Sequence, residues 1–64
     1  MNRTEVGRES FNDALEMCDA IVKLSKLVGD PIAYIEADGI AENVVVLYKD
    51  KLSDGSFVYN FEIL

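Results

Sequence analysis

The sequence predicts an α+β fold in which one N-terminal helix packs on a three-stranded antiparallel meander, in the order αβββ. Two observations predict this fold class. Apolar residues recur at helical spacing from Phe11 to Val28, and after Pro31 they alternate among β-branched and aromatic types. A chain of 64 residues is expected to form a single domain, 1–64, that buries only about 60% of the surface of its unfolded form.

The predicted helix covers residues 10–28 and ends at well-marked residues. Lys26 lies in the last turn, Gly29 can adopt the left-handed conformation after the helix, and Pro31 follows. The apolar residues that share one face at 100° per residue are Phe11, Ala14, Leu15, Cys18, Ile21, Val22, Leu24, Ser25 and Val28. We expect this face to pack on the sheet.

The start of the helix has two possible positions. Ser10 can cap the first turn, with Asp13 three residues later as a shortened capping box. Thr4 can instead cap an earlier turn, although Gly7 would weaken that extension by about 1 kcal/mol relative to alanine.

Three strands are predicted at residues 32–37, 40–48 and 57–63. Asp38-Gly39 is typical of a two-residue type I′ turn and predicts a hairpin between the first two strands. The polar connection Lys49–Ser56 leads to the third strand, whose register stays open because a long loop specifies it poorly.

Both faces of the predicted sheet carry apolar residues, and one helix can cover only one of them. The other face would expose a larger apolar patch than small monomers usually show. We therefore expect a two-fold homodimer; a monomer with an apolar sheet face is the alternative. The pattern does not decide which face the helix covers.

The sequence does not indicate an active site, because without histidine general acid–base catalysis would fall to carboxylates, Lys or Tyr. There is no histidine, and a single cysteine, Cys18, cannot form a disulfide or a Cys/His zinc site. The helical pattern places Cys18 on the apolar face, where a thiol is expected to be inert. We expect no enzyme activity, no cofactor and no metal; a small enzyme or ligand-binding protein would need a pocket that the pattern does not indicate.

Acidic residues outnumber basic ones 12 to 6, giving a net charge of −6. This balance disfavours direct binding to nucleic acid or to an anionic membrane. No basic residue lies between Lys26 and Lys49. The candidate partner-binding residues are Glu9, Asp13, Glu16 and Asp19 on the predicted helix, and Glu36, Asp38 and Glu42 on the predicted hairpin. A solvated helix face is the ordinary alternative explanation for the first group.

Small size, acidic balance and αβββ order together resemble phage-encoded DNA-mimic inhibitors. The segment Glu42–Leu47 is similar to a strand of the uracil-DNA glycosylase inhibitors, over about a tenth of the chain. The resemblance implies a protein that occupies the basic groove of a bacterial nucleic-acid-binding protein, such as an HU-type nucleoid protein, uracil-DNA glycosylase or a CRISPR effector.

The polar N-terminus lacks the apolar run of a signal peptide, and the longest apolar run, Val44–Tyr48, is too short to cross a bilayer. We expect a complete small protein in the cytoplasm of a bacterial host, with no membrane partner. The alternative function is an interaction module that binds a protein through its apolar sheet face or through the edge strand Val58–Leu64, by strand addition.

Overall fold

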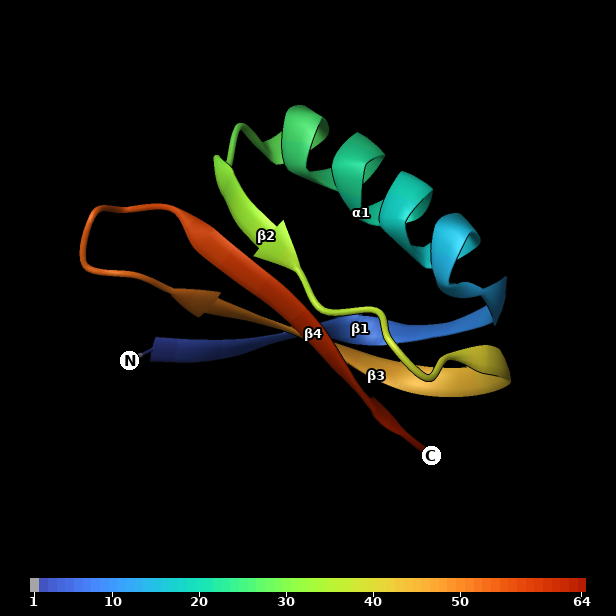
Figure 1. Cartoon of the computed structure of the whole chain (residues 1–64). Coiled ribbons are helices and arrows are strands. Elements are labelled where there is room, and N and C mark those ends of the chain that lie inside the picture. Colours follow the sequence, from blue (N-terminus) through green and yellow to red (C-terminus); the bar gives the residue numbers. More distant parts are fainter. Residues whose placement is uncertain (1) are drawn as a thin grey trace.

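The computed structural model describes residues 2–64 and has the order βαβββ. Its elements are β1 (Asn2–Asp13), α1 (Ala14–Val28), β2 (Ile32–Ile35), β3 (Ala41–Lys51) and β4 (Phe57–Ile63). The strands form one mixed sheet in the order β1-β3-β4-β2, and α1 lies across one of its faces (Figure 1). The predicted three-stranded antiparallel meander is therefore wrong: the sheet has a fourth strand and one parallel pair.

The additional strand, β1, comes from the segment where the sequence offered two helix starts. It pairs antiparallel with β3, from Asn2 opposite Lys51 to Asp13 opposite Ala41. A bulge lies between Glu5 and Gly7. Because a bulge shifts the alternation of side chains between the two faces, β1 has no continuous period-two pattern. A helix start at Thr4 or Ser10 is therefore wrong.

The helix begins at Ala14 rather than near residue 10, but it ends as predicted. Gly29 follows it with φ 80°, and its N–H donates to the Ser25 carbonyl at 2.8 Å. Ile21 is fully buried as predicted, but the buried face is rotated relative to the expected one, since Met17, which was not predicted on it, is also fully buried. Leu15, predicted on the buried face, is 71% exposed.

The hairpin predicted at Asp38-Gly39 does not form. β2 pairs in parallel with β4, with Ile35 opposite Tyr59. A turn is present, with Gly39 at φ 86°, but it takes the chain past β4 to β3 instead of joining neighbouring strands. Ala37 and Ile40, on either side of this turn, are buried in the core, so tertiary packing overrides the local hairpin signal.

β3 and β4 form the antiparallel pair that the sequence predicts. Their register runs from Lys51 opposite Phe57 to Val45 opposite Ile63. The bounds of β4 agree with the prediction, whereas β3 extends three residues beyond predicted residue 48. The extension shortens the connection, which is closed by a hydrogen bond from the Leu52 N–H to the Ser56 carbonyl at 2.8 Å.

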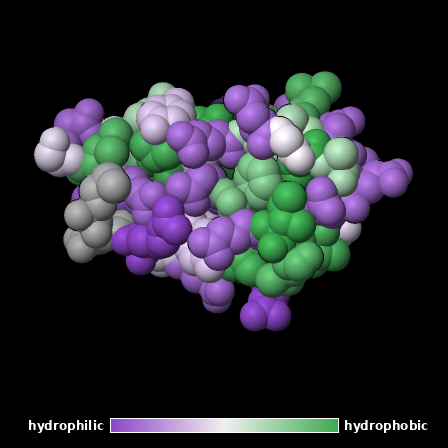
Figure 2. All heavy atoms as spheres, turned by 60° about the horizontal axis from the view of Figure 1, so that its bottom comes forward, coloured by the Kyte–Doolittle hydropathy of each residue, from purple (hydrophilic) through white to green (hydrophobic). Residues whose placement is uncertain are grey.

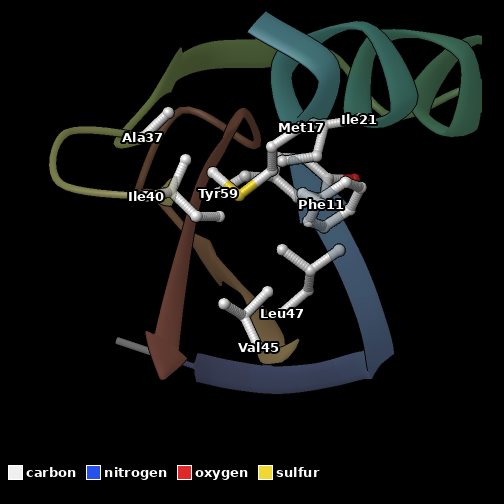
Figure 3. Packing of buried hydrophobic residues seen from close by; sticks show 8 residues of the cluster. All are labelled: Phe11, Met17, Ile21, Ala37, Ile40, Val45, Leu47 and Tyr59. Atoms are coloured by element: carbon white, nitrogen blue, oxygen red, sulfur yellow. The ribbon is translucent and has the colours of Figure 1, made fainter. Parts of the chain in front are cut away.

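One hydrophobic core lies between α1 and the sheet (Figure 3). β3 contributes Val45 and Leu47, β4 contributes Tyr59, and α1 contributes Met17 and Ile21. The covered face of the sheet is therefore the one that carries odd-numbered residues of β3 and β4. In the part of the chain that the structure describes, no helix is long and apolar enough to span a membrane.

The face opposite α1, the open face, is less apolar than expected. Figure 2 shows hydrophilic residues over its middle and hydrophobic residues gathered at one end. Val46 is buried there without a helix above it, whereas Val44 and Leu64 are 49% and 63% exposed. The apolar patch on which the homodimer prediction rests is thus confined to one end of this face.

Candidate protein-binding surfaces

Two of the predicted partner-binding acids, Asp13 and Glu16, cap the helix. Asp13 is the N-cap, and its Oδ1 accepts a hydrogen bond from the Glu16 N–H at 2.8 Å. Glu16 Oε2 in turn accepts from Asn12 Nδ2 at 2.8 Å and from the Asn12 N–H at 3.3 Å. This is a variant of the capping box, because the reciprocal bond comes from Asn12 rather than from the N-cap Asp13, and it lies three residues later along the chain than predicted. Both side chains are exposed, so the cap leaves negative charge at the surface.

The remaining acids of the predicted helix stripe lie on different elements. Glu9 belongs to β1 and lies opposite Val45, whereas Asp19 is an exposed residue of α1. A continuous helical stripe that includes Glu9 is therefore wrong. Asp13, Glu16 and Asp19 still follow one another at the start of α1.

Glu42 lies beside the capping box because of the β1–β3 register. Its neighbour Ala41 is opposite Asp13, and Glu42 itself is exposed at φ 45°. Asp13, Glu16 and Glu42 thus meet where β1 ends, α1 begins and β3 begins. We call these three residues the acidic end.

Basic residues concentrate at the other end of the sheet. Lys51 lies opposite Asn2, and the neighbouring Lys49 Nζ forms an ion pair with Asp30 at 2.6 Å. The hydrogen bond to Asp30 raises the pKa of Lys49. This end also carries acids, because Asp30 and Asp50 pair with its basic residues and Glu5 lies opposite Tyr48, so it is of mixed charge, in contrast to the acidic end.

Glu36 and Asp38 line a separate hollow, of about 310 Å³, with Asn60 and Phe61. Both carboxylates are exposed, and they follow β2 at the point where the chain leaves the sheet. The seven predicted acids therefore do not form one site: three make the acidic end, two flank this hollow, and Glu9 and Asp19 lie apart.

The backbone of β4 alternates between its two neighbours. The Leu64 N–H, just after the strand, donates to the Val44 carbonyl at 3.0 Å, so even-numbered residues direct their backbone polar groups toward β3. Odd-numbered residues face β2: the Phe57 N–H donates to the Pro31 carbonyl at 2.9 Å.

β2 covers only the first half of β4. The last contact is the hydrogen bond from the Glu36 N–H to the Tyr59 carbonyl at 2.8 Å, and the strand pairing stops at Tyr59. Because odd-numbered residues of β4 face β2, Phe61 and Ile63 direct their backbone polar groups toward the same side of the strand, but β2 does not extend that far. The predicted edge strand Val58–Leu64 is thus interior in its first half and free along its second.

A polar network lies on the open face, toward the end of the sheet that carries Lys49 and Lys51. Asp50 is only 6% exposed and accepts hydrogen bonds from Arg3 Nε at 3.0 Å and Arg3 Nη2 at 3.2 Å. Asn60 Nδ2 donates to the same carboxylate at 3.2 Å, and Arg3 also lies over the Tyr48 ring. The hydrogen bonds from Arg3 lower the pKa of Asp50.

Among residues 2–64, no three His, Cys, Asp or Glu side chains come together as a possible metal site. Cys18 is partly buried beside the core. No family model matches the chain, and comparisons with curated proteins and with solved structures found no significant match.

Proposed function

We propose that the protein is a non-enzymatic inhibitor that occupies the DNA-binding groove of a basic nucleic-acid-binding protein, such as an HU-type nucleoid protein of a bacterial host. The observation that carries the proposal is the acidic end. Asp13, Glu16 and Glu42 come from three elements, and the basic residues nearest them along the chain are several residues away: Arg8, Lys23 and Lys49. Such a surface attracts a groove built to bind phosphates, in a salt-dependent way.

Because Asp13 and Glu16 cap the helix, substitutions at these two residues would affect stability as well as binding. Replacing Asp13 would remove the N-cap and cost about 0.5–2 kcal/mol of stability, so lost binding would have two explanations. Glu42 makes no side-chain hydrogen bond or ion pair among the described residues. Glu42→Lys is therefore the cleaner variant, and Glu5→Lys, on the exposed side of β1 near the opposite end, is its control.

The experiment measures how well each variant displaces a labelled DNA duplex from a purified HU-type protein. Each reversal changes the net charge by two, from −6 to −4. We expect Glu42→Lys to weaken competition roughly three- to tenfold at low salt and Glu5→Lys to have a smaller effect. The proposal fails if the unmodified chain does not displace DNA, and the acidic end is not the binding surface if both variants behave alike.

A second candidate function is favoured by the free half of β4. Backbone groups of Phe61 and Ile63 point outward beside the hollow at Glu36 and Asp38, which is the geometry that strand addition requires. In this function the protein is an interaction module that pairs with an extended segment of its partner. Such binding depends on main-chain hydrogen bonds and resists salt more than charge pairing does.

Ile63→Pro tests this second function. Proline removes the outward N–H of Ile63 and leaves the hydrogen bond from Leu64 to Val44 in place. Ile63→Ala shortens the same side chain but keeps the N–H, so it serves as the matched control. We expect loss of partner binding with proline alone; equal binding by both variants would exclude strand addition at this edge.

A further inference from the structure

A groove runs between α1 and β1 on the covered side of the sheet. It consists of two hollows, of about 280 Å³ and 200 Å³, that share Val6 of β1 and Leu24 of α1 in their walls. Figure 1 shows why it forms: α1 follows β1 directly and then diverges from it toward β2. The first hollow lies toward the end of the helix, where Val28 also lines it.

Tyr59 supplies a buried polar group to this groove. Tyr59 lines the larger hollow, is 0% exposed, and has a buried hydroxyl without a hydrogen-bond partner among the described residues. In Figure 3 the ring extends from β4 below α1, with its hydroxyl on the side of Phe11 and Ile21. Those two residues line the smaller hollow, so the hydroxyl lies where the hollows meet the core.

Burial also determines the protonation state of this hydroxyl. It raises the pKa of Tyr59, so the phenol is protonated at neutral pH and offers an O–H donor. Buried donors are nearly always hydrogen-bonded in folded proteins, because an unpaired one costs free energy. A groove with one unpaired donor and otherwise mostly apolar walls is the usual construction of a small-molecule site.

We propose that this groove binds a small uncharged molecule with an apolar body and one carbonyl or hydroxyl oxygen, which accepts a hydrogen bond from Tyr59. Val6, Leu24 and Val28 would contact the apolar body. Lys49 also lines the larger hollow, but it is already paired with Asp30 at 2.6 Å. The carboxylates of Glu5 and Glu9 in the walls, and the net charge of −6, oppose anions. The volume suits a ligand at the small end of the usual range, about one aromatic ring with a short substituent.

The binding site is independent of the acidic end, so the two proposals can fail separately. The probe is para-fluoroacetophenone, followed by fluorine NMR, and its control is para-fluoroethylbenzene, in which a methylene replaces the carbonyl. We expect the ketone to bind with a dissociation constant of about a millimolar, as is usual for ligands of this size. Tyr59→Phe should weaken ketone binding about three- to tenfold and leave binding of para-fluoroethylbenzene unchanged.

Two further variants locate the binding. Leu24→Trp should fill the groove and abolish binding of both probes, whereas Tyr34→Phe, on the open face, should change neither. The proposal is overturned if the ketone does not bind the unmodified chain at about 10 mM. It is also overturned if the ketone binds Tyr59→Phe as tightly as the unmodified chain, or still binds Leu24→Trp.

Discussion

Asp50 and Tyr59 are both buried polar residues of the two central strands, on opposite faces of the sheet, and their surroundings differ completely. Asp50, on the open face, accepts hydrogen bonds from Arg3 and Asn60, and it is 6% exposed although no helix covers it. Tyr59, under the helix, is 0% exposed and has no partner for its hydroxyl among the described residues. Burial on the open face is achieved by long polar side chains that bring their own hydrogen bonds, whereas the apolar cover of α1 brings none.

Alanine substitutions of three consecutive valines of β3 compare how much burial on each face contributes to the free energy of unfolding. Val45 lies under the helix at 0% exposure, Val46 lies on the open face at 5%, and Val44 is 49% exposed. We expect Val45→Ala to cost about 2–3 kcal/mol, Val46→Ala about 1–2 and Val44→Ala less than about 0.5. The reason for the order is that Arg8 and Glu62, which flank Val46, can move to fill a cavity more easily than packed core residues can. Urea unfolding of the three variants gives these free energies.

If the chain forms the predicted two-fold homodimer, we expect a different result for the same variants. A second copy packed on the open face would make Val46 and Val44 interface residues. Their alanine variants would then dissociate the dimer, and the loss of stability would depend on protein concentration. Sedimentation equilibrium of the unmodified chain and of Val44→Ala distinguishes this outcome from a monomer, whose unfolding does not depend on concentration.

The Asp50 network predicts how stability changes in acid. Because the pKa of Asp50 is lower in the folded chain than in the unfolded one, its contribution is complete above the unfolded value, near 4. That contribution is lost as the pH falls from there through the folded pKa. Asp50→Asn should lower the melting temperature at about pH 7 and show a shallower decline between about pH 4 and pH 2 than the unmodified chain.

Glu62→Gln is the control for this pH experiment. Glu62 is 3.7 Å from Arg3, but its side chain is 63% exposed, so water screens the interaction. It should change neither the melting temperature nor the acid slope appreciably. If Asp50→Asn declined in acid as steeply as the unmodified chain, the carboxylates elsewhere in the molecule would account for the acid sensitivity.

Local signals predicted the parts of the fold that local interactions determine. The helix end at Gly29 and the antiparallel β3–β4 pair are confirmed, because a left-handed glycine and alternating apolar runs act within a few residues. β1 could not be found this way: of its two large apolar residues, Val6 lies in the bulge and Phe11 beyond it, so the strand has no apolar alternation.

Strand order depends on contacts between residues that are far apart in the sequence. Local patterns therefore could not predict it. The hairpin signal at Asp38-Gly39 was local, whereas the burial of Ala37 and Ile40 against the core decides the path of the chain. The capping role of Asp13 was visible in principle, because Glu16 stands three residues later, as a capping box requires. The sequence predicted Val58–Leu64 as an edge strand, but it could not show that only the second half is free, because this depends on the short β2 pairing with the first half.

The smallest expected effect concerns Tyr59 itself. Tyr59→Phe removes a buried hydroxyl without a partner and keeps the ring, so stability should stay unchanged or rise by up to about 1 kcal/mol. Tyr34→Phe, at an exposed position, should lie within about 0.5 kcal/mol of the unmodified chain. A loss of more than about 1 kcal/mol in Tyr59→Phe would mean that the hydroxyl is hydrogen-bonded in solution, by water held in the groove. The two faces of the sheet would then follow one rule, in which every buried polar group has a partner, supplied by side chains on the open face and by solvent under the helix.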